Sequence, residues 1–165
     1  ICGFSHDLLE LNSWPHDVYF GCRPSSWGWA TWRKEWFSMN WDNKEYDRVL
    51  KNPLNWIRLL KGGSDVPQML RNQVSGRINS WAIRWAATQL LSNRLAVFPR
   101  NSLVYNDGIN RFATNTKRSL RFTVQLDKGV KVNFNFLADA KTDENLMRAF
   151  RAKYSILARL KDKFV

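Results

Sequence analysis

Tryptophan is concentrated in one part of this chain, where its rings could bind a sugar. All nine tryptophans of the 165 residues lie at or before position 85. Trp27, Gly28 and Trp29 bring two large rings together, and such rings stack on the apolar faces of sugars because C–H groups meet the negative ring face. Gly28 permits close approach of a ligand or of backbone. Trp29, Trp32 and Trp36 have the i, i+3, i+7 spacing of one helix face. The rings form either a ligand surface or an aromatic core.

A second group of polar and aromatic residues opens the clearest helix of the sequence, predicted over 79–92. Asn79 and Ser80 can cap its N-terminus, and Trp81 begins its apolar face. Arg84 lies at i+4 from Ser80, so the two share a face. A guanidinium there would bind a phosphate group in a bidentate manner. A surface ion pair is the alternative role for Arg84.

Several classes of site are excluded by residue content. His6 and His16 are too few and too poorly spaced for a usual metal site. Cys2 and Cys22 cannot form a disulfide scaffold. The chain has no Gly-rich phosphate loop, Gly-x-Ser-x-Gly turn or His-Glu-x-x-His pair. Its formal net charge of +12 is compatible with nucleic-acid binding. The basic residues, however, are spread along the chain and match no nucleic-acid recognition module.

The elements that must position these residues alternate between helix and strand. Besides the helix over 79–92, the patterns predict helices over 45–60 and 66–73, and short strands at 18–20 and 95–98. No apolar run approaches the length of a membrane-spanning helix.

Residues 117–165 are expected to form a basic tail, made of a hairpin and a helix. Two apolar segments, 121–126 and 130–136, flank Asp127-Lys128-Gly129, which is a strong hairpin signal. The last helix is predicted from Thr142 to about Phe164, with an apolar stripe surrounded by Lys and Arg. Such a helix either packs on its own domain or attaches to an anionic membrane surface.

Residues 1–116 resemble the bacterial family 2-like glycosyltransferases through motifs that follow one another in the family's order. These motifs are Ile1-Cys2-Gly3-Phe4-Ser5, His16-Asp17-Val18-Tyr19-Phe20, Ser25-Ser26-Trp27-Gly28-Trp29-Ala30-Thr31-Trp32 with Trp36, Gln73 with Gly76-Arg77-Ile78-Asn79-Ser80-Trp81-Ala82-Ile83-Arg84-Trp85, Leu95 to Pro99, and Ser102-Leu103-Val104 with Asn106 and Gly108. Each motif is moderately specific, and the ordered set is more so. The resemblance implies the C-terminal, acceptor-side part of a GT-A type mixed α/β fold, and it does not cover the tail from 117 onward.

The implied activity is transfer of a sugar from a nucleotide-sugar donor to a saccharide or lipid-linked acceptor. In the family, the donor and a divalent Mg or Mn ion bind the N-terminal half through an Asp-x-Asp type motif. This chain has no such motif and starts just after the place where it would lie. We therefore expect the metal only in a full-length enzyme, no metal site within these residues, and no transferase activity from this chain by itself.

The resemblance also implies site residues. Trp27, Gly28, Trp29 and Trp32 would shape the acceptor or donor-sugar pocket, and a core role for Trp32 stays open. Asn79, Ser80, Trp81 and Arg84 would bind substrate at the start of the following helix.

A general base must take the proton of the attacking hydroxyl, and a carboxylate does this well. In the broader superfamily the helix that begins at Asn79 opens with a Glu-Asp pair, but this chain has no carboxylate there. Asp65 and Glu35, and after them Asp42, are the remaining candidates, each with a surface role as the alternative. Asn106 and Asn115 stand where the superfamily often has a His, and amides are poor metal ligands.

These observations predict part of a glycosyltransferase for bacterial surface polysaccharide or lipopolysaccharide synthesis. The expected location is cytoplasmic, peripheral at the inner face of the membrane, with no specific nucleic-acid partner. The alternative is a non-catalytic module that binds a saccharide or, through its charge, nucleic acid.

Overall fold

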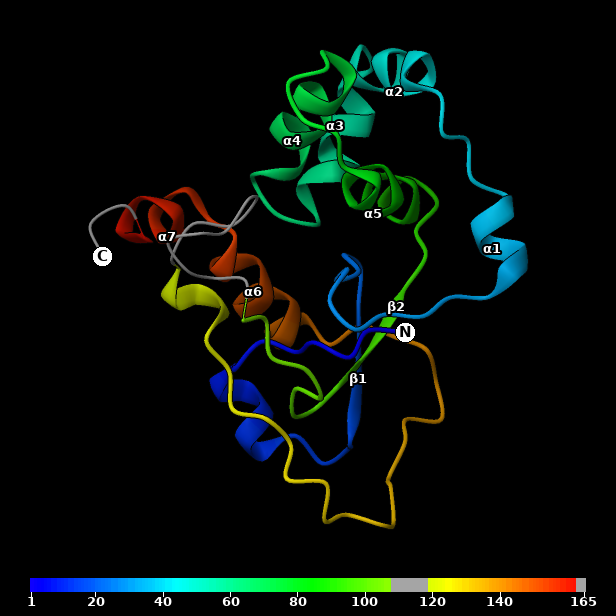
Figure 1. Ribbon diagram of the computed structural model, residues 1–165. Helices are drawn as coiled ribbons and strands as arrows, with labels where there is room; N and C mark the ends of the chain where they lie inside the picture. Colours follow the sequence, from blue (N-terminus) through cyan, green and yellow to red (C-terminus); the bar gives the residue numbers. More distant parts are fainter. Residues whose placement is uncertain (108–118, 163–165) are drawn as a thin grey trace.

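The fold is mixed α/β, with a small two-stranded sheet, a group of helices at one end of it and one further helix beside it (Figure 1). The computed structural model describes residues 1–107 and 119–162. Strand β1 (Val18–Gly21) pairs antiparallel with β2 (Ala96–Pro99), with Tyr19 opposite Phe98. Both strands lie where the sequence predicts them, because their β-branched and aromatic residues suit a half-buried sheet.

The helices α2 (Asn43–Leu50), α3 (Pro53–Leu60), α4 (Val66–Val74) and α5 (Trp81–Leu91) pack together on one side of the sheet (Figure 1). Their shared core consists of buried side chains from all four helices: Tyr46, Leu59, Val66, Leu70, Ile83, Ala87 and Leu90. The helix predicted over 45–60 is two helices, because Pro53 has no N–H to continue α2 and instead occupies the first turn of α3. The Asn52 side chain caps that turn.

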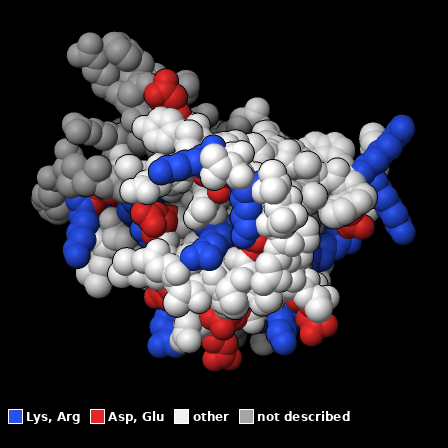
Figure 2. Space-filling view, turned by 90° about the horizontal axis from the view of Figure 1, so that it is seen from below, with Lys and Arg blue, Asp and Glu red and all other residues white. Residues whose placement is uncertain are grey.

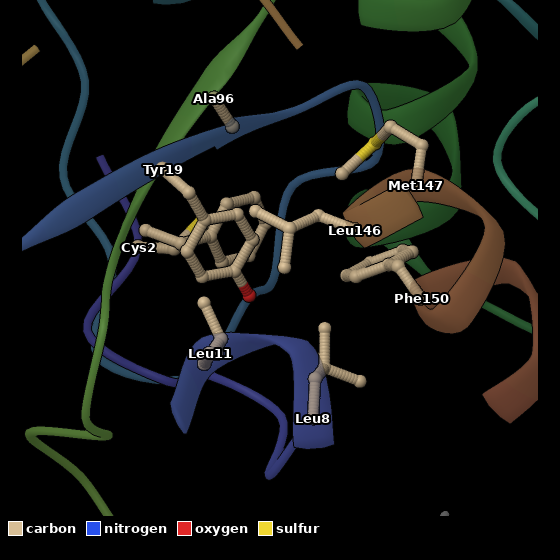
Figure 3. Packing of buried hydrophobic residues seen from close by; sticks show 9 residues of the cluster. Cys2, Leu8, Leu11, Tyr19, Ala96, Leu146, Met147 and Phe150 are labelled. Carbon is tan, nitrogen blue, oxygen red and sulfur yellow. The ribbon is translucent and has the colours of Figure 1, made fainter. Parts of the chain in front are cut away.

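A second core joins the two ends of the chain. The N-terminal segment, the 3-10 helix η1 (Leu9–Ser13), the sheet and α6 (Glu144–Lys153) all contribute to it (Figure 3). Leu146, Met147 and Phe150 of α6 pack against Tyr19 and Phe98. Side chains from both sides of the predicted boundary at residue 116 therefore fill one core.

The predicted hairpin is wrong. Among the described residues, the segments 121–126 and 130–136 form no strand pair, and Leu120–Phe122 is instead a 3-10 helix, η2. The turn itself forms, because Gly129 has φ +66° and its N–H donates to Asp127. Four apolar residues after the turn are all exposed: Val130, Val132, Phe134 and Phe136. A two-stranded hairpin with no buried face is marginally stable in water.

The predicted final helix is interrupted at Tyr154, and Ser155 starts a new helix, α7 (Ile156–Lys161), by accepting a hydrogen bond from the N–H of Ala158. Packing on its own domain is confirmed for α6. The apolar side chains of α7 are not packed in this way, because Ile156, Leu157 and Leu160 are exposed. Phe164 lies outside the described residues. Within the described part of the chain, no helix has the length and apolarity needed to cross a membrane.

Candidate functional site

Five tryptophan rings meet on one side of the molecule and form the tryptophan cluster: Trp29, Trp36, Trp41, Trp81 and Trp85. The centroids of Trp29 and Trp81 lie 4.9 Å apart, and those of Trp36 and Trp41 lie 4.6 Å apart. Trp85 is buried at the base of the cluster, while Trp81 keeps 37% of its surface exposed. The cluster is therefore partly core and partly a solvent-facing aromatic surface.

Trp27 does not belong to this cluster. Its ring packs edge-on against Phe4 at 4.7 Å and against Phe122 at 5.3 Å. The Trp27 and Trp29 rings thus lie in different ring clusters, contrary to the prediction of two adjacent rings. Between them, Gly28 has φ +53°, and a Cβ at this position would meet Val104 at 2.5 Å. The close approach that Gly28 permits is therefore one within the chain.

Trp32 is also separate. Helix α1 spans only Arg33–Phe37, so Trp29 lies in the extended segment before it and Trp32 precedes its first turn. The predicted helix face of Trp29, Trp32 and Trp36 therefore does not form. Trp32 is 66% exposed and has no ring partner among the described residues.

The start of α5 is capped by Ser80, as the sequence predicts, and not by Asn79. The Ser80 hydroxyl accepts a hydrogen bond from the N–H of Ile83, and the Ser80 N–H donates to the Gln73 side chain at 2.6 Å. Trp81 then enters the tryptophan cluster. Asn79 is exposed, and no hydrogen bond of its side chain is observed within the described chain.

Arg84 extends the cluster with a positive charge. Its guanidinium lies 5.3 Å from the centroid of Trp41, and its Nη1 donates to the Trp41 carbonyl at 2.9 Å. No carboxylate pairs with Arg84 among the described residues, so the ion-pair alternative is not what the structure shows. Its Nε is buried without a hydrogen-bond partner in the same part of the chain.

Asp65 is not available as a free base. Arg23 binds both of its oxygens, at 2.7 and 3.0 Å, and the Asp65 side chain is only 13% exposed. The Arg23 guanidinium in turn lies 3.9 Å from the ring centroid of Tyr154. This geometry makes Asp65 part of a buried ion pair that joins the two cores.

Glu35 and Asp42 have different surroundings. Glu35 lies 2.5 Å from Arg94, and its side chain remains 36% exposed. Asp42 caps α2 by accepting a hydrogen bond from the N–H of Lys44 at 2.9 Å, which is a structural role. Of the three predicted carboxylates, only Glu35 combines a neighbouring cation with access to solvent.

A buried polar network around Tyr154 was not predicted from the sequence. The Tyr154 hydroxyl lies 2.8 Å from His6 Nε2, across 148 residues of sequence. Burial, aided by the charges of Lys153 and Arg23, lowers the pKa of His6 to about 3. Burial also raises the pKa of Tyr154. No local pattern could have indicated a contact between residues so far apart in sequence.

Within the described residues, no group of three or more His, Cys, Asp or Glu side chains is placed to hold a metal ion. We assign no metal ligand among these residues. Asn115 lies outside the described residues. A pocket beside Ser5 and Arg100 and another beside Lys61 and Arg151 are not lined by any predicted site residue.

Charge is dispersed on the face shown in Figure 2, where Lys and Arg side chains lie among Asp and Glu.

Comparisons with protein-family models, with curated proteins and with solved structures gave no match to this chain.

Proposed function

We infer that this chain is the acceptor-side part of a GT-A type glycosyltransferase, and that the tryptophan cluster binds the saccharide acceptor. One observation carries the proposal. The Trp-Gly-Trp motif and the start of α5 are far apart in sequence, and both are predicted site segments. Their Trp29 and Trp81 rings lie 4.9 Å apart. Partly exposed aromatic rings of this kind suit the apolar faces of sugars.

In the proposed reaction, an acceptor hydroxyl attacks the anomeric carbon of a nucleotide sugar. The bond from that carbon to the diphosphate oxygen breaks, and the nucleoside diphosphate leaves. The attacking hydroxyl gives its proton to a carboxylate base. Glu35 is the better candidate for this role, because it directly precedes Trp36 and stays partly exposed, whereas both oxygens of Asp65 are bound by Arg23.

Arg84 is proposed to orient the acceptor. Its Nε has no partner among the described residues, and the guanidinium lies over Trp41 at the cluster. A hydroxyl or phosphate oxygen of the acceptor would accept a hydrogen bond from it.

The proposed location is the cytoplasmic face of the membrane, where a lipid-linked acceptor would be available. Its support is α7, whose exposed Ile156, Leu157 and Leu160 lie beside Arg159 and Lys161. An apolar face flanked by cations suits an anionic lipid surface.

The test is calorimetric titration of the chain with a panel of oligosaccharides of different monosaccharide composition. Saturable binding that Arg84→Gln weakens would support the proposal, whereas absence of binding across the panel would contradict it. Incubation with nucleotide sugars then separates the transferase from a purely binding module: we expect no transfer by this chain alone, and transfer when a donor-binding half is supplied.

A further inference from the structure

A pocket of about 190 Å³ lies away from the tryptophan cluster, where four elements meet. Its walls come from Cys22 after β1, Lys61 after α3, Arg94 after α5 and Arg151 on α6. Three cations from three parts of the sequence thus converge on one cavity. None of the residues that line it is acidic.

The charge of this pocket is only partly neutralised. Arg94 is paired with Glu35, which lies 2.5 Å away. Lys61 and Arg151 have no ion-pair partner among the described residues. Three cations and one carboxylate leave a net charge of about two positive units, which matches a phosphate monoester of about −1.5 to −2 at neutral pH.

Part of the pocket wall is apolar. Leu90 and Met147 contribute buried side chains to it, and Leu95 contributes one that is 38% exposed. The cavity therefore offers cations to an anionic group and an apolar surface to a substituent attached to it. Inorganic phosphate alone would leave this apolar wall unused.

Cys22 reports directly on the pocket. Its thiol donates a hydrogen bond to the Lys61 carbonyl at 3.3 Å. Burial raises the pKa of the Cys22 thiol, and the charges of Arg151 and Lys61 act in the opposite direction. An anion bound to these two cations would cover the thiol and remove their favourable effect on the thiolate, which is the reactive form.

We propose that this pocket binds a phosphate monoester that carries a small apolar group, with Lys61 and Arg151 contacting the phosphate and Leu90 and Met147 contacting the apolar group. The site shares no residue with the tryptophan cluster and goes beyond the proposed function. A failure of either proposal leaves the other standing.

The experiment follows alkylation of Cys22 by iodoacetamide, with mass spectrometry of its peptide, at increasing concentrations of phenyl phosphate. We expect saturable protection that slows modification about tenfold, because the thiolate is both covered and less favoured. Inorganic phosphate should protect only at higher concentration, and phenol should not protect. Lack of saturable protection by phenyl phosphate, or equal protection by phenol, would overturn the proposal.

Arg148 provides a matched control on the same helix, since it is exposed and does not line the pocket. Arg151→Gln should weaken protection about tenfold, the effect of losing one charged hydrogen bond, whereas Arg148→Gln should leave it unchanged. Equal protection in both variants would also overturn the proposal. Cys2, which is 2% exposed, reports whether each variant stays folded. If Arg151→Gln exposes Cys2, Lys61→Gln takes its place, with unchanged protection again contradicting the site.

Discussion

The ring of Trp29 lies against that of Trp81, with centroids 4.9 Å apart and planes inclined by 32°. This contact joins the extended segment before α1 to the first residue of α5. Trp85, one turn further along α5, lies 5.8 Å from Trp29 and is buried beneath it. Trp29 therefore contacts both a buried ring, Trp85, and a partly exposed ring, Trp81.

The Arg23–Asp65 pair should matter for stability more than for catalysis. Asp65→Asn leaves the Arg23 charge buried with a weaker partner, so we predict a loss of about 3–5 kcal/mol in the free energy of unfolding, measured with urea. Glu45→Gln, in the exposed Glu45–Arg48 pair, should cost about 0.5 kcal/mol or less. Equal effects of the two substitutions would mean that the buried pair has no special structural role.

His6 should make the chain sensitive to acid. Its pKa is about 3 in the folded chain and about 6.5 in an unfolded one. Between these values the unfolded chain binds one proton more, so the stability that His6 contributes is complete above pH 6.5 and is lost as the pH falls toward 3. We predict that wild type loses about 1 kcal/mol more than His6→Gln as the pH falls from 6 to 5. Parallel pH profiles of the two proteins in urea unfolding would contradict this.

Gly28 should tolerate no side chain. Its φ is +53°, and an added Cβ would meet Val104, so Gly28→Ala should destabilise the chain by about 1–3 kcal/mol. Gly76 has φ +73° and open space around it, so Gly76→Ala should cost only the backbone strain, about 1 kcal/mol. Thermal unfolding measures both. If the clash with Val104 is real, adding Val104→Ala to Gly28→Ala recovers part of the loss.

The membrane proposal requires a test that preserves α6, because α6 belongs to the core and cannot be removed. We predict that the chain sediments with vesicles containing phosphatidylglycerol and not with phosphatidylcholine alone. Replacing Ile156, Leu157 and Leu160 with Ser should weaken this binding about tenfold, since apolar area leaves the interface. A control with Leu54 and Ile57 of α3 replaced, which are similarly exposed, should bind normally. Undiminished binding by the α7 variant would refute the proposal.

Local features of the fold could be predicted from the sequence, and long-range ones could not. The strands, α4 and α5 follow from periodicity and caps. The Asn52-Pro53 pair marks the break between α2 and α3, and Ser155 marks the start of α7, although neither break was predicted. The predicted hairpin does not form, because the turn residues at Gly129 do not determine whether the flanking segments bury an apolar face.

The same distinction applies to the site. The motifs indicated Trp29, Trp81 and Arg84, which the structure brings to one cluster. They could not separate Trp27 from Trp29, because the positive φ of Gly28 turns the chain between them. Trp41 was missed, since its role depends on the packing of α5 against the segment before α2.

The central claim is that the solvent-facing rings of the tryptophan cluster bind saccharide. The most direct measurement is calorimetric titration of wild type, Trp81→Ala and Trp56→Ala with the tightest-binding oligosaccharide of the panel. Trp56 lies on α3, outside the cluster, where Arg71 covers its ring. Urea unfolding confirms that each variant is folded at the temperature of the titration. We predict that Trp81→Ala weakens binding about tenfold, the effect of losing one stacking contact, while Trp56→Ala binds as wild type does. Unchanged affinity in a folded Trp81→Ala chain would contradict the claim.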